Sequence, residues 1–554
     1  MAGLELIVVV LAAVLLMSWT ARRLHLSEPM LLLAGGILIG LTPPFEHVDI
    51  PPDVILMIFL PALLYWESLT ASLREIKSNF RSIALQATGL VLVTALAVAA
   101  VAHGLGYAWP LAFVLGAVLA PTDVAAVAAV ARAMPRRILT LLRTESLLND
   151  GTALVLLAVG LELLTAGEPF SWATTTLRFV ESYAGGVAIG AAIAFALIPV
   201  RRHLHEGILH SGLSVATPFI AFLPAEALHV SGVLAVVTCG LITNRVGPRI
   251  IGPDARLQSV SFWEVTTFLL NGALFVLIGI QTPAAVRALT SISLLQAAGI
   301  AAAVSATVIS VRIAWFYTVP YLVRLIDRRP QQRERRISAR QRLPLAWAGM
   351  RGAISLAAAL AIPATTTDGR PLEQRDAVIF ITVVVIVVTL ALLGPALPPV
   401  VRRAHFSEDV TEADEVDLAV RHLAATALTE MPALVSRFDV PRDACSYITA
   451  DLNKQMALGA GELHDAGASG MRRQVSAVFA LEEALLEVKR TALAELRNQG
   501  RIDDIVLRRV QRHLDAEEQS LELRDALLPP ADGAVEPDRD RDRDRGREDG
   551  PAPS

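Results

Sequence analysis

The chain has 554 residues, of which 54% are hydrophobic and 18% are charged, with a formal net charge of −4 and a mean hydropathy of +0.52. These values exclude an ordinary soluble enzyme and favour a membrane protein. The two cysteines, Cys239 and Cys445, exclude a disulfide framework and a cysteine-based metal site. Charged residues are concentrated beyond residue 400, so the net charge averages two unlike regions and says little about partners.

Apolar segments long enough to span a bilayer recur along the first 400 residues. A spanning helix needs about 20 mostly apolar residues. Thirteen segments are candidates: 3–20, 29–42, 52–69, 81–103, 110–131, 144–166, 181–200, 209–224, 229–244, 258–281, 290–323, 344–363 and 376–400. The eighth and ninth are separated by only four residues, and merging them would give twelve spans.

The basic residues of the loops favour thirteen spans. If the N-terminus lies outside, the cytoplasmic loops carry twenty-two Lys and Arg residues and the outer loops carry four. Such a bias is typical of membrane proteins, and twelve spans would reverse it for every later loop. We therefore predict a multi-pass protein of the plasma (inner) membrane, with an outside N-terminus and a cytoplasmic C-terminus.

The character of the chain changes after residue 403. Apolar residues in 471–498 recur at helical spacing among many charged ones. We predict a transmembrane domain at 1–403, a small helical cytoplasmic domain with a regulatory role at 404–528, and a disordered tail at 529–554. The sequence has no P-loop, and we expect no cofactor and no nucleic-acid partner.

The fifth segment, 110–131, carries Asp123 near its middle, directly after Pro121 and Thr122. A carboxylate at this depth faces the bundle interior or a wet cavity. Proline removes a backbone donor and frees carbonyl groups of the preceding turn, which is tolerated only where the break is buried or lines a cavity. The pattern predicts an unwound stretch with oxygen ligands for a small monovalent cation. A proline kink with a capping aspartate is the alternative.

The sixth segment, 144–166, opens with an acidic patch. At 3.6 residues per turn, Ser146 and Asp150 share one face, and Glu145 and Asn149 share the adjacent face. Asp150 lies roughly 9 Å from the predicted start of the helix, which is too deep for a residue that only complements the helix dipole. We predict that this carboxylate exchanges a proton for a cation.

Two arginines also lie inside apolar segments. Arg312 is the only charged residue of 300–321 and requires a carboxylate partner, for which Glu145 is the candidate. Arg351 lies in Gly349-Met350-Arg351-Gly352, where the glycines permit an irregular or closely packed stretch.

Two further acids have open roles. Glu67 lies near the cytoplasmic end of its segment and is either an interface acid or a cation ligand. Glu264 is a possible acid of an aqueous funnel.

Four passages together resemble the sodium/proton exchanger family, which comprises NhaP-type and NHE-type antiporters. They are Ala120–Asp123, Glu145–Asp150, Ala227–Val233 and Gly349–Ala353. The resemblance implies an all-α polytopic membrane protein of about 13 transmembrane helices in two inverted repeats. Two broken helices would cross in its core, here 110–131 and 344–363.

The resemblance also implies roles for individual residues. Asp150 would be the essential carboxylate that binds Na+ or a proton, and Ser146, Thr122 and Glu67 would complete the Na+ site. Asp123 would neighbour Asn149. Glu145 would pair with Arg312 to hold the core together, with Arg351 as a further core charge.

The activity implied is exchange of Na+ or Li+ for H+ by a homodimer in the lipid bilayer, which is transport and not enzymatic catalysis. The Asn149-Asp150 pair is similar to the electroneutral branch, since one titrating carboxylate carries either one Na+ or one proton. A K+/H+ antiporter on the same scaffold is the main alternative, because oxygen ligands do not reveal ion size. A cation channel and an intramembrane enzyme are weaker alternatives, because filter repeats and a Ser/His or paired metal-ligand motif are absent from the sequence.

Overall fold

The computed structural model describes residues 2–24, 26–45, 55–123, 127, 134, 136–166, 172–204, 206–326, 338–365 and 371–406, with short stretches between 422 and 521. The chain divides into two compact units, Met1–Ser407 and Glu408–Ser554. The regular secondary structure of the described part is helical apart from one β-bridge between Thr365 and Pro371. The predicted tail at 529–554 and most of the predicted domain at 404–528 lie outside the described residues.

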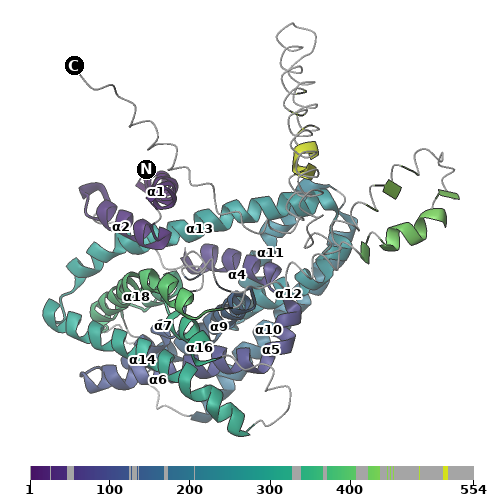
Figure 1. The fold of residues 1–554 in the computed structure, drawn as a ribbon. Coiled ribbons are helices and arrows are strands. Elements are labelled where there is room, and N and C mark those ends of the chain that lie inside the picture. The colour runs from purple at the N-terminus through teal and green to yellow at the C-terminus, as the bar shows by residue number, and fades with distance from the viewer. Residues whose placement is uncertain are drawn as a thin grey trace, which may run out of the picture. The chain divides into compact units, whose positions relative to one another are not determined.

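The first unit is a bundle of helices (Figure 1). In chain order they are α1 (Ala2–Leu24), α2 (Glu28–Gly40), η1 (Pro43–Phe45), η2 (Ile55–Phe59), α4 (Leu60–Thr70), α5 (Leu73–Ala84), η3 (Leu85–Leu90), α6 (Val91–Gly104), α7 (Trp109–Leu119), α9 (Arg136–Ala166), α10 (Trp172–His203), α11 (Gly207–Ala227), α12 (Gly232–Ile250), α13 (Pro253–Ala288), α14 (Leu294–Ile326), α16 (Ala339–Trp347), α17 (Ala353–Leu360) and α18 (Arg375–Arg403). Helix α13 packs against α2, and α14 packs against α6 and α18.

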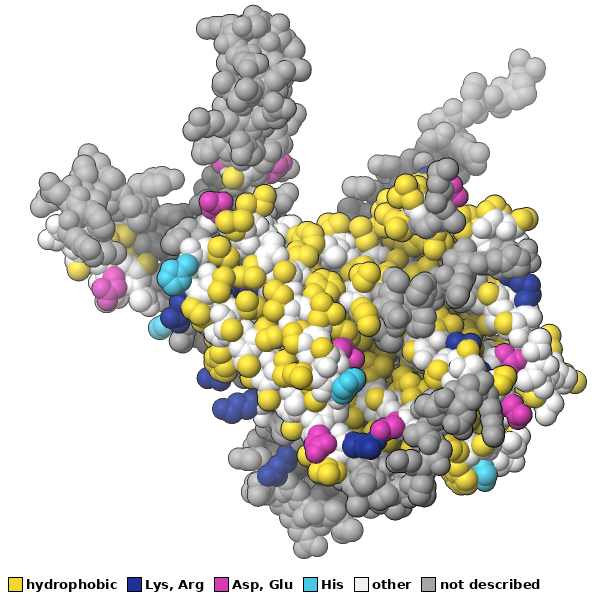
Figure 2. Space-filling view, turned by 180° about the vertical axis from the view of Figure 1, so that it is seen from behind, with side chains coloured by type: hydrophobic (Ala, Val, Ile, Leu, Met, Phe, Trp, Pro, Cys, Tyr) yellow, Lys and Arg dark blue, Asp and Glu magenta, His cyan; other side chains and the backbone are white. Residues whose placement is uncertain are grey.

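Many of these helices are apolar enough to lie in a bilayer. In the described part of the chain, eight are long and apolar enough to cross a membrane, and α2, α4, α7 and α12 contribute shorter apolar stretches. Large hydrophobic side chains such as Val8 and Phe195 are exposed, and Figure 2 shows hydrophobic side chains over the middle of one face with most charged ones toward its edges. Such a surface requires an apolar surrounding. The chain is an α-helical, multi-pass membrane protein.

Each of the thirteen predicted segments overlaps one or more of these helices, although residues 52–54, 124–126 and 128–131 lie outside the described residues. The number of membrane crossings stays a prediction. The eighth and ninth segments are separate helices, α11 and α12, joined by a turn in which His229 has a φ of 57°. The sixth segment begins earlier than predicted, because α9 starts at Arg136 and not at 144. The first part of α9 contains many polar residues, so a search for apolar segments does not detect it.

Helix α13 is held close to α2 by glycines. A Cβ atom added at Gly36 would collide with the main chain of Val276 and Gly279, and one added at Gly279 would collide with that of Leu33 and Gly36. The two backbones therefore approach as closely as small residues allow. This contact fixes the helix that forms one wall of the cavity described below.

The second unit is described only in short helical stretches. Leu486 and Leu514 are buried, with Leu521 packed against them. Lys489 forms an ion pair with Glu517 at 2.9 Å. The regulatory role predicted for this part of the chain stays a prediction.

Candidate functional site

The first element of the site is a break after α7. This helix ends at Leu119, and the chain runs without helical structure through Ala120–Asp123. Pro121 explains the break, because its ring clashes with the preceding turn and it offers no N–H to continue the helix. The unwound stretch predicted around Pro121 is therefore present. Residues 124–126 lie outside the described part of the chain.

The second element is a break between α16 and α17, at Ala348–Gly352. The two breaks meet, because the Asp123 N–H donates to the Met350 carbonyl at 2.8 Å. Gly352 is needed at this crossing, since an added Cβ atom would overlap the Asp123 carboxylate. Each break thus supplies a hydrogen-bond partner that the other has lost by leaving the helix.

Helix α9 docks onto the first break through Thr122. The Ser146 hydroxyl donates to the Thr122 carbonyl at 2.9 Å, and the Asn149 amide donates to the Thr122 hydroxyl at 2.8 Å. Asp150 follows one turn after Ser146 on the same helix face and is 4% exposed. Since α9 begins at Arg136, Asp150 is its fifteenth residue and lies about 21 Å from the start of the helix. The distance of roughly 9 Å predicted from the sequence was therefore too short.

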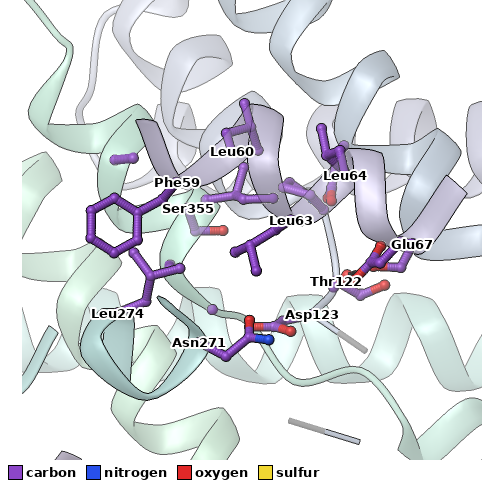
Figure 3. A pocket seen from close by; sticks show the side chains of 17 residues that line it. Phe59, Leu60, Leu63, Leu64, Glu67, Thr122, Asp123, Asn271, Leu274 and Ser355 are labelled. Carbon is purple, nitrogen blue, oxygen red and sulfur yellow. Dashed lines mark hydrogen bonds between the residues drawn. The ribbon is translucent and has the colours of Figure 1, made fainter. Parts of the chain in front are cut away.

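These elements surround a cavity of about 630 Å³ of empty space, including its opening. Three carboxylates line it, from Glu67 on α4, Asp123 at the first break and Asp150 on α9. Figure 3 shows Glu67 and Thr122 at one end of the cavity, and Phe59 and Leu274 at the other. Among the described residues, no basic side chain lines this cavity. The remaining lining residues are Leu60, Leu63, Leu64, Pro121, Ser146, Asn271, Gly352, Ala353, Ile354, Ser355 and Ala357.

A closely packed polar cluster beside this cavity contains the arginines. Arg312 donates to Glu145 at 2.8 Å, and both side chains are almost fully buried. Its Nε also donates to the Leu345 carbonyl at 3.2 Å, which ties α14 and α9 to α16. Thr122 belongs to this cluster and also lines the large cavity.

Arg351 supports the crossing from within. It is 1% exposed, and its Nε donates to the Leu119 carbonyl at 3.0 Å, at the last residue of α7. Its Nη1 donates to the Gly349 carbonyl, and its main-chain N–H donates to the Thr389 hydroxyl at 3.2 Å. A guanidinium in this place complements the negative end of α7 and satisfies a carbonyl left by the break.

The structure separates the acids whose roles were open. Glu67 lines the large cavity, whereas Glu264 is exposed on α13 and is absent from the cavity lining. Asn271 and Ser355 also line the cavity, and no role was predicted for either residue. Asn271 was detectable as an isolated amide in an apolar run, but only the fold shows which way it faces.

Known proteins resemble this chain over most of its length. The family described as "Sodium/hydrogen exchanger, transmembrane" matches residues 9–403. The chain belongs to the sodium/hydrogen exchanger family. Members of this family are transporters, so the exchanger is not an enzyme.

Two curated relatives and one solved structure are similar to this exchanger. An uncharacterized Na(+)/H(+) exchanger of Mycobacterium tuberculosis is 41% identical over 532 residues, covering 96% of this chain and 97% of the relative. A "Sodium, potassium, lithium and rubidium/H(+) antiporter" of Bacillus subtilis is 31% identical over 412 residues, covering 71% of this chain and 61% of the relative. The structure of the sodium proton antiporter MjNhaP1 from Methanocaldococcus jannaschii aligns with a TM-score of 0.58 at 18% identity, over 73% of this chain and 100% of that one. That likeness supports the fold.

Proposed function

We propose that this exchanger moves Na+ or Li+ across the membrane in exchange for H+. The observation that carries the proposal is the large cavity, where three carboxylates gather without a basic side chain among the described lining residues. Asp150 is buried, and a buried negative charge requires compensation by a cation or by a proton. A site that accepts either, but not both together, couples the two flows.

Asp150 is the carboxylate that we assign to this exchange. It is buried and lies on the face of α9 that also carries Ser146, next to the Thr122 carbonyl. Carboxylate, hydroxyl and carbonyl oxygens are the ligands that hard cations prefer. We propose that Asp150, Ser146, Thr122 and Glu67 hold the dehydrated Na+, and that Asp123 contributes negative charge beside them.

We propose electroneutral exchange of one Na+ for one H+. Asn149 adds no charge next to Asp150, and its amide is already engaged with the Thr122 hydroxyl at 2.8 Å. If Asp150 alone titrates during the cycle, it carries one cation in one direction and one proton in the other. No net charge then crosses the membrane.

K+/H+ exchange is the second candidate, and a relative supports it. The Bacillus subtilis protein is named an antiporter of sodium, potassium, lithium and rubidium against H+. The ligand types in the cavity suit any of these ions. A cation channel is a weaker candidate.

The setting of this activity is also a proposal. The distribution of basic residues supports a plasma (inner) membrane protein with an outside N-terminus and a cytoplasmic C-terminus. We propose thirteen spans in two inverted repeats, a homodimeric assembly, alternating access through movement of the broken helices, and a role in pH homeostasis.

The test is cation-driven proton movement in proteoliposomes that hold a pH gradient. Na+, Li+ and K+ are added separately, with and without a clamped membrane voltage. We expect Na+ and Li+ to dissipate the gradient independently of voltage, and Asp150→Asn to abolish the response. Glu181→Gln is the matched control, because Glu181 is an exposed carboxylate of α10 outside the cavity.

Each other outcome has a definite meaning. A response to K+ alone moves the assignment to the second candidate. Strong voltage dependence contradicts the one-carboxylate argument. Exchange that survives in Asp150→Asn overturns the site, and no response to any cation in the wild-type protein overturns the proposed function.

A further inference from the structure

The large cavity holds two polar side chains that the proposed exchange at Asp150 does not use. Ser355 is 1% exposed, and its hydroxyl has no hydrogen-bond partner among the described residues. Asn271 is a half-buried amide that lines the same cavity. Buried polar groups nearly always have a partner, so a hydroxyl that lines a cavity without one points to an occupant of that cavity.

The two side chains come from different parts of the fold. Asn271 lies on α13, which the glycine contact fixes against α2. Ser355 lies in the first turn of α17, directly after the second break. Figure 3 shows Asn271 on the same side of the cavity as Asp123, and Ser355 between these residues and the end formed by Phe59 and Leu274.

Asp123 gives this part of the cavity its charge. The carboxylate lies against Gly352, at the N-terminal end of α17, so it offsets the partial positive charge of that helix end. An amide oxygen, a hydroxyl oxygen and a carboxylate oxygen then line one region. This set of ligands suits a hard cation and the water that it keeps.

We propose that Asn271, Ser355 and Asp123 form a second subsite, which holds a partly hydrated monovalent cation, Na+, beside the Asp150 site. The inference rests on the proposed cation/proton exchange. It adds a site that binds the ion before the ion loses its remaining water and moves to the Asp150 site. Ser355 and Asn271 act on cation affinity and do not take part in proton transfer. The subsite joins α13 to the broken helix, so an ion bound there contacts both.

The test compares cation affinity with protein stability. In proteoliposomes, we expect Ser355→Ala to raise the KM for Na+ about two- to tenfold, the effect of losing one hydrogen-bond-sized contact, with an unchanged maximal rate. In detergent, Ser355→Ala should melt at or above the wild-type temperature, because the removed hydroxyl has no protein partner among the described residues. A purely structural role would instead lower the melting temperature.

Three further variants sharpen the result. Asn271→Ala should raise the KM for Na+ in the same way. Ser355→Thr keeps a hydroxyl and should have a KM for Na+ close to that of the wild-type protein. Ser305→Ala is the matched control. Among the described residues, the buried hydroxyl that it removes bonds only to the Ala301 carbonyl of its own helix, at 2.7 Å, and the variant should leave the KM unchanged.

The failure of this inference differs from failure of the proposed function. If the wild-type protein shows no cation-driven proton movement, the exchange function itself is wrong. If the wild-type protein exchanges and Asp150→Asn does not, but Ser355→Ala and Asn271→Ala keep the wild-type KM, the subsite holds water only and the inference is overturned. Should Asn271→Ala not fold, Ser355→Ala and Ser355→Thr decide the question alone.

Discussion

A cavity and a closely packed polar cluster meet at the crossing of the broken helices, and their charges differ. In the cluster, Arg312 pairs with Glu145, and Arg351 lies at the end of α7. The lining of the cavity holds three carboxylates and, among the described residues, no basic side chain. Thr122 belongs to both.

This difference in charge indicates that the polar cluster stabilises the fold, whereas the cavity carries the proposed transport. Where opposite charges are matched inside the protein, they tie helices together and leave no demand for an ion. In the large cavity, by contrast, a cation or a proton from solution can complete the charge of the buried Asp150. Each variant below changes residues of the polar cluster, of the cavity or of the crossing between them. Together they test whether the cluster and the cavity have separate roles.

The largest effect is expected on the matched side. Glu145→Ala leaves the Arg312 guanidinium buried without its carboxylate, and breaking a buried pair in this way costs about 3–5 kcal/mol. We expect a clear loss of melting temperature in detergent. The double variant Glu145→Leu with Arg312→Met should recover much of the loss, because both charges are then gone. A single variant that melts like the wild type would contradict the supporting role.

The next effect is expected where the breaks cross. Gly352→Ala places a methyl group on the Asp123 carboxylate, and overpacking of this kind costs about 1–3 kcal/mol. Both melting temperature and exchange rate should fall, since Asp123 moves with the break. Gly299→Ala is the control, because nothing lies within 4 Å of a Cβ atom there, and alanine inside a helix is favoured by roughly 0.5–1 kcal/mol. Equal behaviour of the two variants would argue against a tight crossing.

The smallest effect is expected from the hydrogen bond between Ser146 and Thr122, which lies at the large cavity. Ser146→Ala removes the 2.9 Å hydrogen bond to the Thr122 carbonyl and should cost about 0.5–1.5 kcal/mol. Ser146 is also assigned as a cation ligand. We therefore expect the rise in the KM for Na+, expressed as a free energy, to exceed the loss in the free energy of unfolding. Transport kinetics and melting curves measured on the same preparation, with Ser305→Ala beside them, check this. A loss of stability with an unchanged KM would restrict Ser146 to a structural role.

The sequence predicted the parts of this arrangement that depend on local chemistry. Pro121 beside Thr122 and Asp123 favoured a break in its segment, and the glycines around Arg351 permitted the second one. A lone arginine in an apolar segment required an acid, and the structure places Glu145 beside Arg312.

Other features depend on tertiary contacts or on polar helix ends, which apolar patterns do not reveal. The early start of α9 lies in residues too polar for a hydropathy search, so the distance of Asp150 from the start of its helix was underestimated. Asn271 and Ser355 lie on helices far apart in sequence, and only packing brings both to one cavity. The π-helical turns of η2 and η3 have no periodicity that a search for apolar segments detects.

The central claim is that a cation and a proton compete for Asp150, and proton release on cation binding tests it most directly. Purified protein in weakly buffered detergent solution is titrated with NaCl while the pH is followed, with choline chloride as the salt control. We predict that the wild-type protein releases protons as Na+ binds and that Asp150→Asn releases none. Sodium binding without proton release in the wild type, or undiminished release in Asp150→Asn, would contradict the account.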